Sequence, residues 1–175
     1  MMSKSLGKQA EERIQQWLDR PADGYSFDRI PDQMSGLYMV SRNICDFHLY
    51  KYPYEYWIES KATEQDRFSF DQLTDTQRNG LCWKSTIFGN YGVVIVLFIT
   101  YQRAFIFNIN DIAELTDPEH FDHIKDIHAE DASYLKIKSI NIKKIDKWPI
   151  PYKEIQTIPS RKNLLEYTGE FTVPQ

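Results

Sequence analysis

The chain has 175 residues, 42% of them hydrophobic and 14% aromatic, so it suits one domain with a packed core and is too apolar for a disordered protein. No apolar run approaches the roughly 20 residues that span a bilayer, the polar N-terminus has no secretory signal, and two cysteines exclude a disulfide framework, so we expect a cytoplasmic protein. The formal net charge is −4, yet residues 136–175 carry eight Lys or Arg against four Asp or Glu. This asymmetry predicts a basic surface on the C-terminal segment, although a solvated charged face explains it equally well.

The first part of the chain predicts one helix and a β-hairpin. Residues 5–20 place apolar side chains three and four positions apart, the spacing of a helix with one buried face. Residues 25–30 have the composition of a short strand. Residues 44–50 and 55–62 alternate apolar and polar side chains, and turn residues 51–54 lie between them. The sequence therefore predicts two antiparallel strands joined by a tight turn.

A second helix and a second pair of strands follow. We expect the helix over about residues 74–83, with Asp71 or Thr74 as its N-cap. Residues 92–101 are almost wholly apolar, which indicates a strand buried on both faces. A short turn then leads into a strand at 104–109, so these two strands should form a hairpin.

The remaining elements complete a mixed domain. Asn110 or Asp111 is expected to cap a third helix, and residues 136–145 alternate Ile with Lys or polar side chains, as in a strand. The natural assembly is an α/β fold with one central mixed β-sheet flanked by helices. We expect a single domain over residues 1–175, with a core at about 5–115 and a basic C-terminal extension at about 136–175.

The first predicted hairpin brings two carboxylates together. Asp46 and Glu59 are equally far from the turn at Tyr52–Pro53, so a turn centred there puts them opposite each other. Their Cβ atoms would then be about 4.5–5.5 Å apart on one face of the sheet. Two such carboxylates repel each other unless a cation such as Mg²⁺ lies between them, and Lys61 would lie beside it. The simpler alternative is a surface ion pair worth under about 1 kcal/mol.

Asp46, a turn and then Glu59-Ser60-Lys61 resemble the motif of the PD-(D/E)XK nuclease superfamily, and the flanking residues resemble RecU-type Holliday junction resolvases. These flanking residues occur in the family's order: Gly7 four residues before Glu11, Phe47 after Asp46, Ser69-Phe70, and Gln77 on the next helix. Two features depart from the family. Cys45 occupies a position where the family usually has Thr, and only 34 residues separate Glu11 from Asp46, so the stalk region is shortened.

The resemblance implies a restriction-endonuclease-like nuclease domain and a Mg²⁺- or Mn²⁺-dependent endodeoxyribonuclease acting in DNA recombination and repair. Asp46 and Glu59 would ligate the metal, with the Ser60 carbonyl oxygen as a further ligand. Lys61 would orient the attacking water, while Glu11 would reach the metal's water shell and Gln77 would hold Lys61 or the scissile phosphate. A homodimer acting on a four-way junction is the implied assembly.

Several side chains are candidates for DNA contacts, because Arg and Lys neutralise phosphates. They are Arg67, Ser69 and Arg78 near the site, and Lys143, Lys144, Arg161 and Lys162 in the basic extension. Ordinary solvent exposure explains each of them equally well. His120, His123 and His128 match no standard zinc spacing, so we interpret them as a structural or fortuitous cluster.

Three rival functions remain open. The shortened stalk region favours a restriction- or repair-type nuclease that cuts another DNA structure. A non-catalytic DNA-binding module on a nuclease scaffold is compatible with the same motifs. A small-molecule enzyme built on the His120–His128 segment would require bound zinc.

Overall fold

The structure is a computed structural model that describes residues 5–18, 25–31, 43–116, 139–148 and 152–155. Three α-helices and eight β-strands are found in this part of the chain, with short 3₁₀ turns between them. The helices are α1 (Leu6–Leu18), α2 (Asp75–Ser85) and α3 (Ile109–Thr116). The strands are β1 (Tyr25–Arg29), β2 (Phe47–Lys51), β3 (Tyr54–Thr63), β4 (Arg67–Ser69), β5 (Asn90–Phe98), β6 (Arg103–Asn108), β7 (Ser139–Asn141) and β8 (Lys153–Ile155).

Six strands form one mixed sheet in the order β1-β2-β3-β5-β6-β8. β3 and β5 are parallel, and every other neighbouring pair is antiparallel. The predicted α/β class with a central mixed sheet and flanking helices is therefore confirmed. The β2–β3 hairpin also has the predicted register, because Lys51 faces Tyr54 next to the turn and Phe47 faces Ile58 at the far end.

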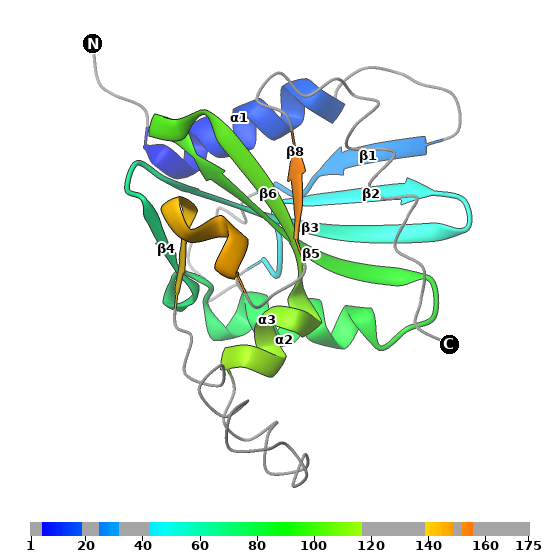
Figure 1. Ribbon diagram of the computed structural model, residues 1–175. Coiled ribbons are helices and arrows are strands. Elements are labelled where there is room, and N and C mark those ends of the chain that lie inside the picture. Colours follow the sequence, from blue (N-terminus) through cyan, green and yellow to red (C-terminus); the bar gives the residue numbers. More distant parts are fainter. Residues whose placement is uncertain (1–4, 19–24, 32–42, 117–138, 149–151, 156–175) are drawn as a thin grey trace, which may run out of the picture.

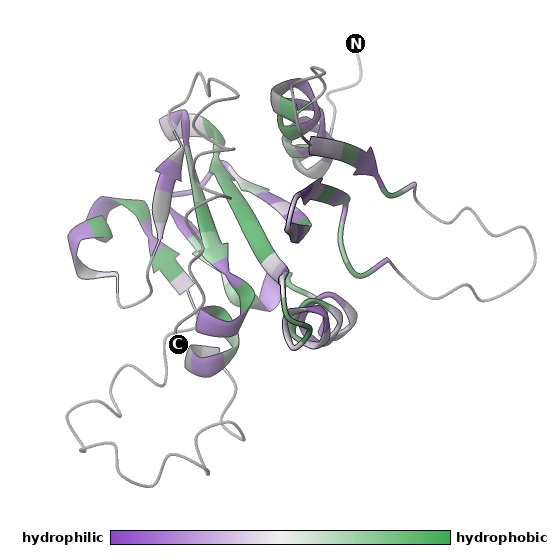
Figure 2. Ribbon diagram, turned by 90° about the vertical axis from the view of Figure 1, so that its right-hand side faces the viewer, coloured by the Kyte–Doolittle hydropathy of each residue, from purple (hydrophilic) through white to green (hydrophobic). Residues whose placement is uncertain are grey.

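The helices cover both faces of this sheet and create two separate cores (Figure 1). α1 buries Ala10, Ile14 and Leu18, which are spaced as one helical face, against strand side chains that include Ile58. α2 and α3 pack on the opposite face, where Leu81 and aromatic side chains fill the second core. Figure 2 shows the apolar residues concentrated in the central strands between these layers.

β5 is the buried centre of the sheet. All of its residues from Tyr91 to Phe98 are buried, as the continuous apolar run predicts. A turn with Gln102 in the left-handed conformation (φ 51°) leads into β6. α3 begins directly after β6, and its cap differs from both expected residues, because Asn108 accepts a 2.9 Å hydrogen bond from the Asn110 N–H.

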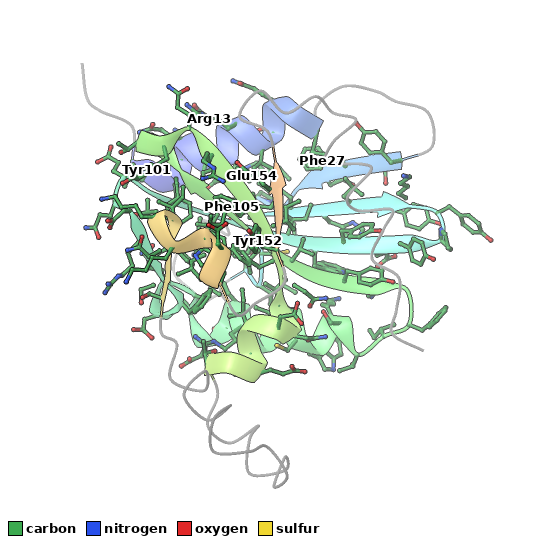
Figure 3. The ribbon with its side chains drawn as sticks, in the orientation of Figure 1. Arg13, Phe27, Tyr101, Phe105, Tyr152 and Glu154 are labelled. Atoms are coloured by element: carbon green, nitrogen blue, oxygen red, sulfur yellow. The ribbon has the colours of Figure 1, made fainter. Side chains whose placement is uncertain are left out.

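Parts of the C-terminal segment are integral to the fold. β7 pairs with β4 in a small second sheet, and β8 adds to the edge of β6. Tyr152 packs edge-on against Phe105, with ring centroids 5.7 Å apart (Figure 3). Arg103 forms a bidentate ion pair with Glu154. Of the expected strand at 136–145, residues 139–141 form β7, residues 142–145 form 3₁₀ turns instead, and residues 136–138 lie outside the described part of the chain.

Candidate active site

The end of the β2–β3 ladder places Asp46. Its backbone N–H donates to the Ile58 carbonyl at 3.0 Å, and its own carbonyl accepts from the Ile30 N–H at 2.8 Å. Regular pairing with β3 stops at Phe47, so the next N–H along β3, that of Ser60, has no strand carbonyl opposite it. The Asp46 side chain takes this position, and its carboxylate therefore lies beside the Glu59–Lys61 segment.

Two hydrogen bonds from Ser60 hold one oxygen of Asp46. The Ser60 N–H donates to Oδ2 at 2.8 Å, and the Ser60 hydroxyl donates to the same oxygen at 2.5 Å. Ser60 itself is buried. These contacts fix the orientation of the Asp46 carboxylate before any ligand binds.

Glu59 is a buried carboxylate, with only 2% of the residue exposed. Loss of hydration raises its pKa to about 8, and the neighbouring charge of Asp46 adds to this effect, while Lys61 opposes it. Its Oε1 accepts hydrogen bonds from Lys61 and Gln77. Its Oε2 is buried and has no hydrogen-bond partner among the described residues.

Lys61 and Gln77 both contact the same oxygen of the Glu59 carboxylate. Lys61 Nζ lies 2.8 Å from Glu59 Oε1 and 3.1 Å from Gln77 Oε1. Gln77 Nε2 donates to Glu59 Oε1 at 2.6 Å. Gln77 also completes the capping box of α2, because its Oε1 accepts from the Thr74 N–H and Thr74 Oγ1 accepts from the Gln77 N–H.

Further contacts hold α2 against the sheet. Lys84 Nζ lies 3.9 Å above the ring of Trp57, a cation–π contact with β3. The Gly92 N–H of β5 donates to Ser85 Oγ at 2.7 Å, and this hydroxyl donates to the Leu81 carbonyl. These contacts anchor the C-terminal end of α2, and the hydrogen bond from Gln77 to Glu59 anchors its N-terminal end.

Glu11 reaches the site from α1. Its charge contributes to the raised pKa of Glu59, so the two carboxylates are close enough to interact. Its Oε2 also forms an ion pair with Arg29 Nη2 at 2.5 Å. Arg29 could not be found from the sequence, because its place beside Glu11 depends on how α1 packs over the sheet, which no local pattern reveals.

The oxygen of Glu59 that has no hydrogen-bond partner among the described residues indicates that the site suits a metal. A buried oxygen with no donor is costly, and a cation would satisfy it. Asp46 has a second oxygen available beyond the one that Ser60 holds. Mg²⁺ is commonly held by one or two carboxylates plus waters, so this pair fits it. Within the described residues, no group of three or more His, Cys, Asp or Glu side chains could hold a metal.

Four of the predicted DNA contacts lie in or beside the small β4–β7 sheet. Arg67 and Lys144 are exposed around the small β4–β7 sheet, which follows the end of β3. Lys143 lies there too, but its Nζ pairs with Asp66 at 3.0 Å. The Ser69 side chain caps the 3₁₀ turn that follows β4.

Arg78 differs from the other predicted DNA contacts. Its Nη1 donates to Thr116 Oγ1 and its Nη2 to the Phe70 carbonyl, so the guanidinium ties α2 to α3 and to the turn after β4. Its role in phosphate binding stays a prediction. Arg161, Lys162 and the His120–His128 segment lie outside the described residues.

The helices of the described segments include none with the length and apolar content needed to cross a membrane.

No protein-family model matches the chain, and no curated protein matches it. Among solved structures, the chain is similar to Hjc from Archaeoglobus fulgidus, a Holliday junction resolvase from an archaeal hyperthermophile. The TM-score is 0.41 at 17% sequence identity, and the matched region covers 60% of this chain and 78% of the other. A likeness of this size carries neither activity nor substrate from one chain to the other.

Proposed function

We propose that the protein is a divalent-metal-dependent DNA endonuclease that hydrolyses phosphodiester bonds, with a branched DNA such as the Holliday junction as its substrate. The observation that carries the proposal is the environment of Glu59. This buried carboxylate keeps one oxygen without a hydrogen-bond partner among the described residues, and it lies beside a second carboxylate and a lysine. A structural ion pair between Glu59 and Lys61 would require neither a second carboxylate beside it nor an unsatisfied oxygen on Glu59.

The side chains of this site have distinct proposed roles. Asp46 and Glu59 would hold Mg²⁺ or Mn²⁺, with the Ser60 carbonyl as a further ligand. When bound, such a cation stabilises negative charge on a phosphate oxygen and makes a bound water more acidic. Lys61 would orient the attacking water and offset charge that develops on the phosphate.

Two further residues support these roles. Gln77 would keep Lys61 and Glu59 at a fixed spacing, since its amide contacts both of them. Glu11 would bind a water of the metal from the side of α1. A binding site of this kind, held by strands and anchored helices, needs little rearrangement to accept its ligand.

The basic residues beyond the end of β3 are the proposed docking surface for the DNA backbone. Arg67, Lys143 and Lys144 lie around the β4–β7 sheet, and Arg161 and Lys162 of the C-terminal segment are proposed to extend it. Phosphate contacts of this kind position DNA without reading its sequence. A four-way junction is two-fold symmetric, so a homodimer with two sites is the proposed resolving species.

The experiment that tests the proposal is cleavage of four DNA substrates: a four-way junction, a flap, a linear duplex and a single strand. Each is incubated with protein and Mg²⁺, and in parallel with a chelator. The Glu59→Gln variant removes the carboxylate charge but keeps the size of the side chain. Glu55→Gln is the matched control, because Glu55 lies on the same strand and contacts His48 instead.

We expect Mg²⁺-dependent cleavage of the junction by the wild type and by Glu55→Gln, and at least a 100-fold loss in Glu59→Gln, as for removal of a group that stabilises developing charge. Cleavage that survives in Glu59→Gln would overturn the proposed site. Cleavage of the flap or the duplex in preference to the junction would replace the substrate but keep the chemistry. DNA binding without cleavage of any substrate would favour the non-catalytic binding module.

A further inference from the structure

We propose that the Ser60 side chain is a positioning residue whose hydroxyl fixes the Asp46 carboxylate in the orientation that a divalent cation requires. This inference rests on the proposed metal site but goes beyond the ligand role given to the Ser60 backbone. It assigns a function to the Ser60 side chain, whereas the proposed ligand role concerns only the Ser60 backbone carbonyl.

The two hydrogen bonds from Ser60 end on the same atom. The backbone N–H and the hydroxyl both donate to Asp46 Oδ2, at 2.8 and 2.5 Å. A carboxylate oxygen has two lone pairs, so these donors occupy the accepting capacity of Oδ2. The other oxygen, Oδ1, is then the one that remains to bind a ligand.

The Ser60 hydroxyl restricts rotation of the Asp46 carboxylate more than the backbone N–H alone would. The terminal torsion of an Asp side chain is broad and roughly two-fold, so a carboxylate with one hydrogen bond can rock or exchange its two oxygens. A second donor from a different direction restricts this rotation. Ser60 is only 5% exposed, so little water is available to replace its hydroxyl.

This restriction matters because Asp46 lies just outside the regular strand. Asp46 precedes the first residue of β2, and its side chain lies where the ladder has already ended. Residues that orient a metal ligand typically change metal affinity 10–100-fold when they are removed. Ser60 is such a residue in this proposal, since its hydroxyl contacts a proposed metal ligand and not the proposed metal.

The test measures Mn²⁺ affinity of the DNA-free protein by isothermal titration calorimetry. Ser60→Ala removes the hydroxyl and keeps the backbone N–H, whereas Ser60→Thr keeps both donors. Thr63→Val is the matched control, because Thr63 carries a second buried hydroxyl on β3. In the contacts described, this hydroxyl bonds only to the Gln65 N–H and the Arg67 carbonyl. Thermal melts in chelator report the folding of each variant.

We expect Ser60→Ala to weaken Mn²⁺ binding about 10-fold or more, Ser60→Thr to restore it to within about threefold, and Thr63→Val to leave it unchanged. If Ser60→Ala does not fold, Ser60→Cys replaces it, because a thiol of similar size is only a weak donor. Wild-type affinity in Ser60→Ala, or in Ser60→Cys where it is used, would overturn the inference. An equal loss in Thr63→Val would also overturn it, because any buried hydroxyl on β3 would then have the same effect.

Mn²⁺ binding and DNA cleavage together distinguish failure of the positioning role from failure of the proposed endonuclease function. A wild-type protein that binds no Mn²⁺ would overturn the positioning role directly. A wild-type protein that binds Mn²⁺ with the expected order of variants, but cuts none of the four DNA substrates, would support the positioning role and reject the endonuclease.

Discussion

The Gln77 side chain donates a 2.6 Å hydrogen bond from Nε2 to Oε1 of Glu59, a carboxylate that is almost completely buried. The opposite end of the same amide accepts hydrogen bonds from Lys61 and from the Thr74 N–H. Because the Gln77 oxygen accepts from these two donors, the Gln77 amide nitrogen must be the end that faces Glu59. The cap of α2 therefore determines which atoms of Gln77 the proposed catalytic groups meet.

This arrangement allows the two tasks of Gln77 to be separated. In Gln77→Glu, the new carboxylate still accepts from the Thr74 N–H, so the capping box is retained. It cannot donate to Glu59, and it places another negative charge beside that residue. We expect helix content close to wild type and a cleavage rate at least about 10-fold lower in single-turnover assays.

Thr76→Ala is the control for this change, because Thr76 is exposed on the first turn of the same helix. Its cleavage rate should match the wild type. Full activity in Gln77→Glu would show that the amide's donor group has no part in the reaction.

The raised pKa of Glu59 predicts how stability depends on pH when no metal is present. Burial holds the pKa of Glu59 at about 8 in the folded protein, whereas its ordinary pKa of 4.5 applies to the unfolded chain. Between these values the folded state binds more protons, so the free energy of unfolding falls as pH rises. A shift of this size corresponds to a loss on the order of 3–5 kcal/mol across the window.

Urea unfolding in chelator at pH 5 and pH 8.5 measures this loss. Glu59→Gln should remove most of the difference and should be more stable than wild type at pH 8.5. Mg²⁺ should stabilise the wild type at the higher pH, because it binds the ionised carboxylate. If the free energy of unfolding of the wild type changed with pH as little as that of Glu59→Gln, the raised pKa of Glu59 would be contradicted.

The sequence predicted those parts of the site that depend on local patterns. Alternation across a tight turn gave the register that brings Asp46 to the Glu59–Lys61 segment, because a one-residue slip would expose the apolar face. The spacing of Thr74 and Gln77 is the capping-box pattern, and the helix begins where this cap predicts.

Other features depend on contacts between distant segments, which local patterns do not specify. The pairing of β4 with β7 joins residues 70 to 74 positions apart, and each strand has only three residues. The Arg29–Glu11 ion pair similarly requires α1 to be packed over the sheet. The asymmetry between the two oxygens of Glu59 depends on which neighbours are buried with it.

Gly92 controls how closely α2 approaches the sheet. A Cβ at this position would lie 2.7 Å from the Leu81 carbonyl oxygen and 2.9 Å from Ser85 Oγ. Since a backbone atom cannot move alone, Gly92→Ala should shift α2 and lower the free energy of unfolding by about 1–3 kcal/mol. Urea unfolding measures this loss.

Gly7→Ala is the matched control, because a Cβ there would meet nothing within 4 Å and Gly7 lies inside α1. That change should raise stability by about 0.5–1 kcal/mol. If both alanine variants were equally stable, the close approach of α2 to β5 would be wrong.

The two cysteines should differ in reactivity. Burial raises the pKa of the Cys45 thiol to about 12, with further contributions from Glu59 and Asp46. Thiolate is the reactive form, so at pH 8 Cys45 should remain unmodified by a thiol reagent in the folded protein. Cys82 is only partly buried and should be the first to react. Mass spectrometry after brief labelling, with and without urea, locates the modified residue; labelling of Cys45 before Cys82 in the native protein would contradict this environment.

The basic residues near the β4–β7 sheet give the last prediction, which concerns DNA affinity and not catalysis. Lys144 is exposed, and the proposed docking surface includes it. Lys144→Ala should weaken binding similarly for all DNA sequences, and it should reduce the slope of log K against log salt by about 1 if one phosphate contact is lost. Fluorescence anisotropy at several salt concentrations, in chelator, measures this slope.

Lys51→Ala is the control, because Lys51 lies beside the β2–β3 hairpin turn, at the end of β2 away from Asp46. An equal change in both variants would mean that bulk charge, and not a docking surface at this sheet, determines the affinity.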